Sequence, residues 1–217
     1  MRICFVGKGS VSQFREQEYG EKADVFLFGF NGLGEVSYEK ELKGETFFFE
    51  ETALLSKERK SVVVCGCITD TKGHKRKSAL VAENGRLCGV SDLLYAADGE
   101  CSSGFSLRVY DTRVGKMGVI VAEDLYVPDV VKNLVACGSD FIVCPFPKVV
   151  NCITSVLLRA YAYCYGVPIL LCGEGYALSA NGEGEISFAT PQSPAVAEFE
   201  NVREYHLIQL RKRGRRI

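Results

Sequence analysis

Residues 110–129 read YDTRVGKMGVIVAEDLYVPD, and this stretch carries the clearest information about the fold. We predict a strand over residues 105–110 and another over residues 117–122, joined by a turn that Gly115 relieves. Pro128 then suits the first turn of a helix. The stretch therefore predicts a hairpin whose second strand leads into a helix.

Downstream of this stretch the sequence alternates between helices and strands. We expect a helix over 128–137, a strand over 141–144, a helix over 152–165 and a strand over 167–172. Together with the hairpins, this alternation favours mixed sheets covered by helices over a sandwich of sheets alone.

Upstream, short apolar runs bounded by glycine predict further strands. The expected elements are strands at 2–6, 25–28 and 61–68 and a helix at 45–60. Asn84-Gly85 separates two more strands, at 77–82 and 86–90. This dipeptide tolerates the positive φ angles of a two-residue hairpin turn, so these strands should be antiparallel.

Length and composition are typical of one globular domain, which we expect to span residues 1–210. The chain has 217 residues, of which 47% are apolar and 24% charged. Its 26 basic and 27 acidic residues give a net charge of −1, which leaves no overall field to hold a nucleic acid. We interpret the basic tail, residues 211–217, as a solvated end, with a phosphate-contacting arm as the alternative.

Ten cysteines occur without the charged and apolar regions of a secretion signal, so we expect free thiols in a reducing cytoplasm. A metal site is not expected, because Cys65 and Cys67 are separated by one residue on a strand and the only histidines are His74 and His206. No apolar run reaches the roughly 18 residues of a membrane-spanning helix, so no membrane association is expected.

Motifs of nucleotide-binding proteins and serine hydrolases do not fit. Gly7-Lys8-Gly9-Ser10 lacks the P-loop spacing, and Gly29, Gly32 and Gly34 follow the pattern GxxGxG instead of GxGxxG. Ser91 lacks the second glycine of a nucleophile elbow. We therefore expect no cofactor, and a doubly wound nucleotide-binding domain is disfavoured.

The stretch at 110–129 resembles the segment around the nucleophile in the nitrilase (carbon-nitrogen hydrolase) family, where a hairpin leads into GKIGV, a buried strand, CYD and a helix starting at RFPE. Other segments follow in the family's order. ADVFLF at 23–28 resembles ADLVVFPE, ENGRLCG at 83–89 resembles DPDGELIGKYRK, CGSDFIVCP at 137–145 resembles GADILLVPS, and LRAYA with GVPILL at 158–171 resembles RARAxENGVPVV. The resemblance covers nearly the whole chain.

This resemblance implies an α/β (α+β) fold, the nitrilase-like four-layer αββα sandwich, in which two mixed β-sheets are flanked by helices. Family members usually associate through the helical side. We therefore expect a homodimer or a larger homo-oligomer.

In that family a glutamate accepts the thiol proton, a cysteine attacks the amide or nitrile carbon, and a lysine stabilises the oxyanion. Matched segment by segment, the glutamate position falls on Phe30, the lysine position on Leu93 and the cysteine position on Ala122. A slip of one residue would place Asp92 at the lysine position, where an acid would repel the oxyanion. The chain is therefore identified as a degenerate member that lacks the Glu-Lys-Cys triad.

Two acidic residues near the lost triad are candidates for ligand binding. A further acidic residue of the family matches Glu100, and Glu123 directly follows the lost nucleophile. The alternatives are a solvated loop for Glu100 and a helix N-terminal region for Glu123. We expect Phe30, Leu93, Glu100, Ala122 and Glu123 to line one ligand-binding site.

These residues favour a non-catalytic protein that binds a small ligand or a partner protein. The alternative is an amidase or nitrilase-type carbon-nitrogen hydrolase that uses displaced residues such as Glu100, Glu123 or Cys101. The two functions differ in thiol reactivity, because an activated cysteine reacts with a labelling reagent far faster than a buried one.

Overall fold

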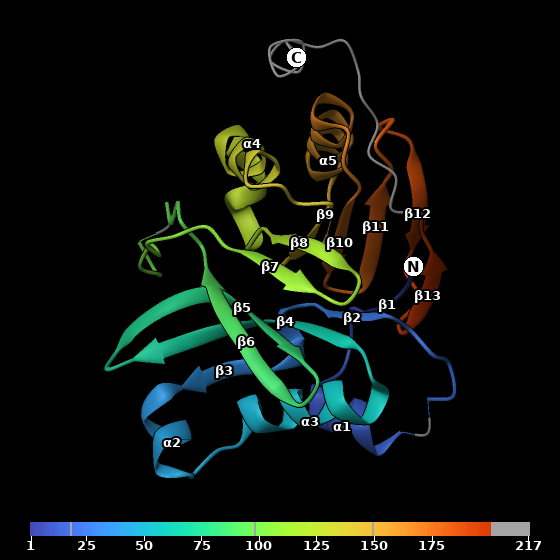
Figure 1. The fold of residues 1–217 in the computed structure, drawn as a ribbon. Helices are drawn as coiled ribbons and strands as arrows, with labels where there is room; N and C mark the ends of the chain where they lie inside the picture. Colours follow the sequence, from blue (N-terminus) through green and yellow to red (C-terminus); the bar gives the residue numbers. More distant parts are fainter. Residues whose placement is uncertain (18, 98, 149, 201–217) are drawn as a thin grey trace, which may run out of the picture.

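Two β-sheets pack face to face in the computed structural model, which describes residues 1–17, 19–97, 99–148 and 150–200. Helices cover the outer face of each sheet, so these residues form four layers (Figure 1). The predicted sandwich of two mixed sheets flanked by helices is therefore confirmed. The predicted basic tail at 211–217 lies outside the described residues.

The first sheet has the strand order β13-β1-β2-β4-β5-β6, and β3 also pairs with β4. Its strands are β1 (Arg2–Val6), β2 (Val25–Phe28), β3 (Gly34–Ser37), β4 (Val62–Thr71), β5 (His74–Glu83), β6 (Arg86–Asp92) and β13 (Ala195–Glu198). β1, β2 and β4 run parallel, so their carboxyl ends meet at one edge. β5, β6 and β13 join by antiparallel pairing, which makes the sheet mixed.

The second sheet has the order β12-β11-β10-β9-β8-β7. Its strands are β7 (Val109–Thr112), β8 (Gly115–Val119), β9 (Phe141–Pro145), β10 (Ile169–Gly173), β11 (Tyr176–Ala180) and β12 (Ile186–Thr190). The three central strands β8, β9 and β10 are parallel, and the outer strands are antiparallel to their neighbours.

Five α-helices among the described residues form the outer layers. α1 (Val11–Glu16), α2 (Tyr38–Lys43) and α3 (Phe48–Arg59) lie on the side of the first sheet, and α4 (Pro128–Ala136) and α5 (Cys152–Tyr165) lie on the second (Figure 1). Two 3₁₀ turns, η1 (Phe30–Gly32) and η2 (Ala122–Tyr126), follow sheet strands. No helix among the described residues is long and apolar enough to cross a membrane.

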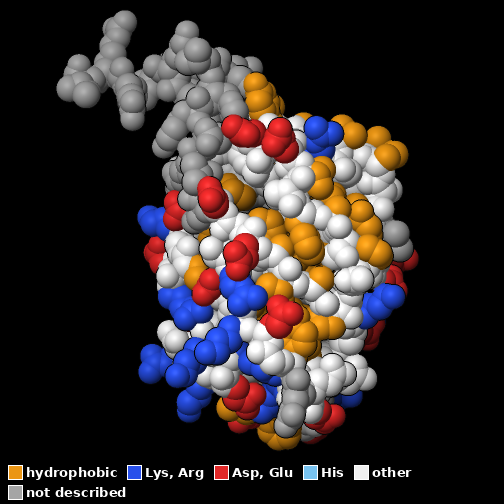
Figure 2. Space-filling model, turned by 90° about the vertical axis from the view of Figure 1, so that its right-hand side faces the viewer, with side chains coloured by type: hydrophobic (Ala, Val, Ile, Leu, Met, Phe, Trp, Pro, Cys, Tyr) orange, Lys and Arg blue, Asp and Glu red, His pale blue; other side chains and the backbone are white. Residues whose placement is uncertain are grey.

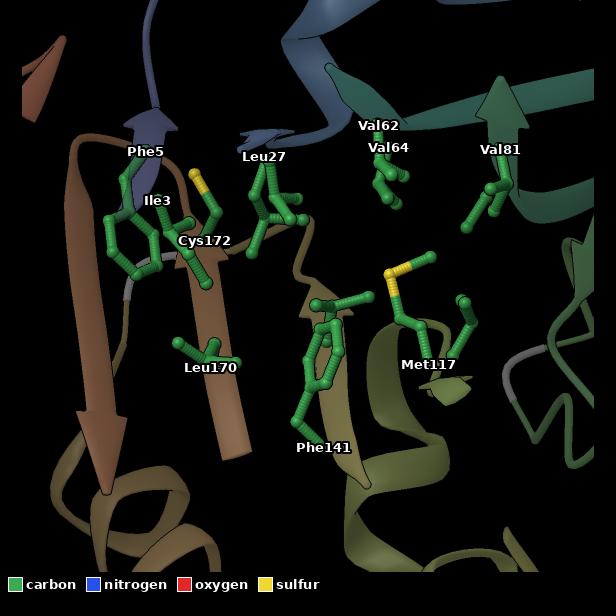
Figure 3. Close-up of a cluster of buried hydrophobic side chains, with 14 of the residues drawn as sticks. Ile3, Phe5, Leu27, Val62, Val64, Val81, Met117, Phe141, Leu170 and Cys172 are labelled. Carbon is green, nitrogen blue, oxygen red and sulfur yellow. The ribbon is translucent and has the colours of Figure 1, made fainter. Parts of the chain in front are cut away.

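Apolar side chains of the two sheets fill the space between them. Figure 3 shows Ile3, Phe5, Leu27, Val62, Val64 and Val81 of the first sheet pointing toward Met117, Phe141, Leu170 and Cys172 of the second. All ten are fully buried. Each large apolar side chain buried in this way contributes roughly 1.5–3 kcal/mol, so this layer holds the sheets together. The carboxyl ends of the central strands border it.

Several sequence predictions agree with the structure. The predicted strands at 2–6 and 25–28 coincide with β1 and β2. Asn84-Gly85 forms the predicted turn between β5 and β6, with φ angles of 53° and 77°.

The predicted strands on either side of Gly115 are placed wrongly. β7 starts only at Val109, and Thr112 pairs with Gly115, so the turn has two residues. β8 ends at Val119, and Ala122 is not in the strand because its backbone turns into η2. The apolar residues continue to position 122, so the sequence gives no sign that the strand ends at Val119.

Candidate functional site

Ala122 occupies a tight turn at the carboxyl end of β8, and residues 120–124 are called the elbow below. Its φ of 52° lies in the left-handed region. A non-glycine residue there costs roughly 1–2 kcal/mol, and such strain persists only where the surrounding packing holds it. Ala122 is fully buried, so the core fixes the elbow in this conformation.

Phe30 follows β2 and fills space between the two sheets. A Cβ atom added at Gly66 of β4 would lie 2.6 Å from Phe30 Cδ2 and 3.0 Å from Pro145 Cβ, so Gly66 makes room for the ring. Phe30 is 9% exposed and belongs to the same buried cluster as Leu93 and Ala122. The residues at the three triad positions therefore all lie in the apolar layer between the sheets.

Leu93 follows β6, and the segment after it is fastened to the elbow. The Leu93 N–H donates to the Lys77 carbonyl oxygen on β5 at 2.8 Å. The Asp124 carboxylate accepts the N–H groups of Leu94 at 2.8 Å and Tyr95 at 3.0 Å. Burial raises the pKa of Asp124, and these two N–H groups offset part of that rise. The buried carboxylate thus ties residues 94–95 to the elbow.

Glu123 lies between two lysine ammonium groups. Its Oε2 is 3.0 Å from Lys77 Nζ, and its Oε1 is 3.1 Å from Lys148 Nζ. The side chains of Lys77 and Glu123 are 11% and 21% exposed, whereas that of Lys148 is 69% exposed. Burial raises the pKa of Glu123, but the hydrogen bond from Lys77 and the nearby ammonium of Lys148 outweigh burial and hold this pKa below its usual range. A half-buried carboxylate and an ammonium therefore sit beside the elbow.

Lys77 and Lys148 are absent from the residues predicted from sequence, yet Lys77 has a recognisable signal. Alternate residues of a strand share one face, and Ala79 and Val81 of the same strand are buried between the sheets. A lysine in this apolar row reaches the interior. The lysine position of the resemblance falls on Leu93, whereas the structure brings an ammonium from the neighbouring strand. Lys148 has no such signal.

Glu100 does not join the buried cluster. It is exposed, in the segment between β6 and β7, whereas Phe30, Leu93 and Ala122 are buried. The segment after Leu93 carries Glu100 to the surface, so its side chain does not share the buried surroundings of the other three residues. Its part in ligand binding stays a prediction.

The ten cysteines all lie in the described residues and are all free. Cys144 contacts the elbow, with its Sγ 3.9 Å from the Ala122 carbonyl oxygen. Burial raises the pKa of Cys144 well above its usual value, and it raises that of Cys172 to about 12. Since the thiolate is the reactive form, these buried thiols are inert.

A metal site finds no support in the described part of the chain, where no group of three or more His, Cys, Asp and Glu side chains is placed to hold an ion. The charged groups next to Ala122 are Glu123 and its two lysine partners, Lys77 and Lys148.

Comparison with known proteins gives similarity in structure alone. No protein-family model matches the sequence, and no curated protein matches it. Nit3 from Saccharomyces cerevisiae, a member of branch 10 of the nitrilase superfamily, has a TM-score of 0.71 at 14% identity, over 90% of this chain and 88% of that chain. A cysteine-to-alanine mutant of the Nesterenkonia AN1 amidase, from the same superfamily, has a TM-score of 0.73 at 15% identity, over 90% and 88%. A carbon-nitrogen hydrolase from Helicobacter pylori G27 has a TM-score of 0.71 at 16% identity, over 90% and 86%.

Proposed function

We propose that this chain, whose fold is that of the nitrilase superfamily, is a non-catalytic member of it that binds a small polar ligand or a partner protein. The elbow carries the proposal. It keeps a strained left-handed backbone at position 122 but presents a methyl group where the resemblance places the nucleophilic thiol. Such strain is typical of functional sites, so a strained turn without its nucleophile points to lost chemistry.

The other two triad positions support the same proposal. Phe30 and Leu93 can neither accept the thiol proton nor stabilise an oxyanion, and both are buried. Loss of a single nucleophile in comparable systems costs on the order of a millionfold in turnover. What remains beside the elbow is the cluster of Lys77, Glu123 and Lys148, whose charged groups can hydrogen-bond a polar ligand.

One observation favours the alternative of a hydrolase with displaced residues. Lys77 brings an ammonium to the elbow, and an oxyanion needs such a group. The alternative also needs an activated nucleophile, however, and burial keeps the Cys144 thiol protonated. For this reason we favour the non-catalytic function.

Ammonia release tests the choice between the two functions. We expect the purified chain to release no ammonia above a buffer control from a panel of short amides, ureido acids and nitriles. Turnover at ordinary enzyme rates, about 1 per second or more, would refute the proposal. If turnover appears, its loss in Lys77→Met, with Lys132→Met on α4 as the matched control, would assign it to the displaced lysine.

The state of the cysteines supports a cytoplasmic location for this role. Cys88, Cys137, Cys152 and Cys164 are exposed and free. Exposed thiols of this number would oxidise in a secreted protein, whereas a reducing compartment preserves them.

We also propose that the chain forms a homodimer through the outer face of α5. Ile153, Val156 and Tyr163 on this face are 56%, 58% and 43% exposed. Arg159 is the single charged residue in the helix, and its Nε donates to the Gly184 carbonyl oxygen at 2.9 Å. A helix that is apolar on both faces is normally covered on both, and a twofold pair of identical chains is the commonest cover.

Sedimentation velocity across a concentration series tests this interface. We expect a dimer for the native chain and a monomer for Val156→Asp, since an acid would be buried at the contact. Asn133→Asp on the exposed face of α4 is the matched control and should stay dimeric. A native chain that is monomeric at every concentration would overturn this part of the proposal.

A further inference from the structure

A cavity of about 520 Å³ lies at the edge of the first sheet opposite to the elbow. Arg2 at the start of β1 and Asp24 just before β2 line it, so it borders the amino ends of these parallel strands. Phe30, in contrast, follows the carboxyl end of β2. The cavity is therefore separate from the candidate site described above.

Five basic side chains line this cavity, which is called the basic cavity below: Arg2, Lys22, Arg59, Lys60 and Arg113. They come from β1, the segment before β2, the end of α3 and the turn between β7 and β8, so distant parts of the chain converge here. Figure 2 shows Lys and Arg side chains gathered at the lower left of the face that it presents. This concentration of charge contrasts with the net charge of −1 of the whole chain.

The acidic residues of the basic cavity neutralise only part of its positive charge. Asp24 accepts the Arg2 backbone N–H at 2.8 Å and pairs with Arg113 at 3.3 Å. Glu58 accepts two hydrogen bonds from Arg15, at 2.7 and 3.1 Å, and Arg15 lies outside the cavity lining. Arg2 has two carboxylates near its guanidinium, those of Glu21 and Glu198, each at 3.5 Å. The positive charge of the lining is therefore only partly neutralised.

Several donors of the basic cavity are left open. Lys22 and Lys60 are exposed and have no ion-pair partner among the described residues. The Nε of Arg2 is not open in this way, because it lies 3.5 Å from the Glu198 carboxylate. The side chain of Arg59, in contrast, is held in place, because its guanidinium donates to the carbonyl oxygen of Tyr19 at 2.6 Å. The lining thus combines an arginine that is held in place with two exposed lysines, Lys22 and Lys60, whose ammonium groups can reach a ligand.

We infer that the basic cavity binds a small organic molecule that carries a phosphate group. The ammonium groups of Lys22 and Lys60 can form charge-assisted hydrogen bonds to the oxygens of a phosphate group. The volume lies in the range of ordinary small-molecule sites. Tyr19 lines the same cavity and offers an aromatic surface for the organic part of the ligand.

Isothermal titration calorimetry of the full chain tests this inference with inorganic phosphate and adenosine monophosphate, and with adenosine as the uncharged probe. We expect one saturable site for both phosphates and none for adenosine. Lys22→Gln/Lys60→Gln should weaken binding by at least about tenfold, since each lysine supplies a charge-assisted hydrogen bond. Both side chains are exposed, so the variant should fold as the native chain does.

Lys40→Gln/Lys43→Gln on α2 removes the same charge away from the cavity and should bind phosphate as the native chain does. Three results would overturn the inference: no saturable binding of either phosphate, equal losses in the two double variants, or equal affinity for adenosine and its monophosphate. Failure of the ammonia test leaves these outcomes unchanged, because the two sites are separate.

Discussion

A thiol introduced at the elbow tests why this fold should lack hydrolase activity. Ala122→Cys restores the side chain that the resemblance places there but leaves Phe30 and Leu93 at the positions of the base and the lysine. Because Ala122 is fully buried, the new thiol enters surroundings like those of Cys172, whose pKa burial raises to about 12. We expect a folded variant with an unreactive thiol and no ammonia release.

The expected rate of thiol labelling follows from the thiolate fraction. At about pH 7.5 a thiol with an ordinary pKa near 8.5 is roughly 9% ionised, whereas one with a pKa of about 12 is about 3000-fold less ionised. The more basic thiolate is more nucleophilic, with a Brønsted slope of about 0.4–0.5, which returns a factor of roughly 25 to 55. The introduced thiol should therefore react about 50 to 120 times more slowly, and limited access adds to this deficit.

Iodoacetamide labelling followed by peptide mass spectrometry measures this ratio within one chain. Exposed Cys152 serves as the internal reference. Ala122→Ser is the matched control for packing, because it adds a side-chain atom without a thiol. Labelling at position 122 as fast as at Cys152, or any ammonia release specific to the variant, would refute the reasoning.

Three further changes test the surroundings of the elbow. Glu123→Gln removes a carboxylate from Lys77, and we expect the free energy of unfolding in urea at neutral pH to fall by roughly 2–3 kcal/mol, less than for a fully buried pair. Since the folded-state pKa of Glu123 is lowered, its contribution is present above about pH 4.5 and is lost as pH falls through the folded-state value, so the native chain should lose stability there more steeply than the variant. Phe30→Ala should lower the free energy of unfolding, measured by calorimetry, by about 3–5 kcal/mol. A much smaller loss would mean that neighbouring side chains move into the space left by the ring. Asp124→Asn places an amide N–H₂ group against one of the two backbone N–H groups that the carboxylate accepts. We therefore expect the free energy of unfolding to fall by about 1–3 kcal/mol and the Leu94 amide to exchange its hydrogen faster. Unchanged exchange at Leu94 would show that Asp124 does not hold residues 94–95.

The parts of the fold that follow local rules could be predicted from the sequence. The Asn84-Gly85 turn could be predicted because these two residues tolerate positive φ angles. β1 and β2 could be predicted because each is a short apolar run of the kind that forms a buried strand. β3 and β12 could not be predicted, because each is short and only partly buried and so lacks a continuous buried apolar run. β13 depends on β1, from which it is separated by nearly the whole chain.

The candidate site shows the same division. Phe30 and Leu93 come directly after strands, so the sandwich brings them into one cluster once the strand order is known. Glu100 lies beyond a segment whose path depends on the long-range bonds of Asp124, and no local pattern encodes those bonds. Lys77 could have been found from strand periodicity, whereas Lys148 follows β9 in an irregular segment and could not.

The position of β13 beside β1 has a consequence for the order of events during synthesis. β1 leaves the ribosome before the other described strands of its sheet, yet its antiparallel partner β13 is the last of them, and Ile3 pairs with Ala197. Until that strand emerges, one edge of β1 stays open to other chains. A nascent chain should therefore wait with an incomplete first sheet, and chaperones that recognise unpaired strands should bind it at this stage and leave once the sheet closes.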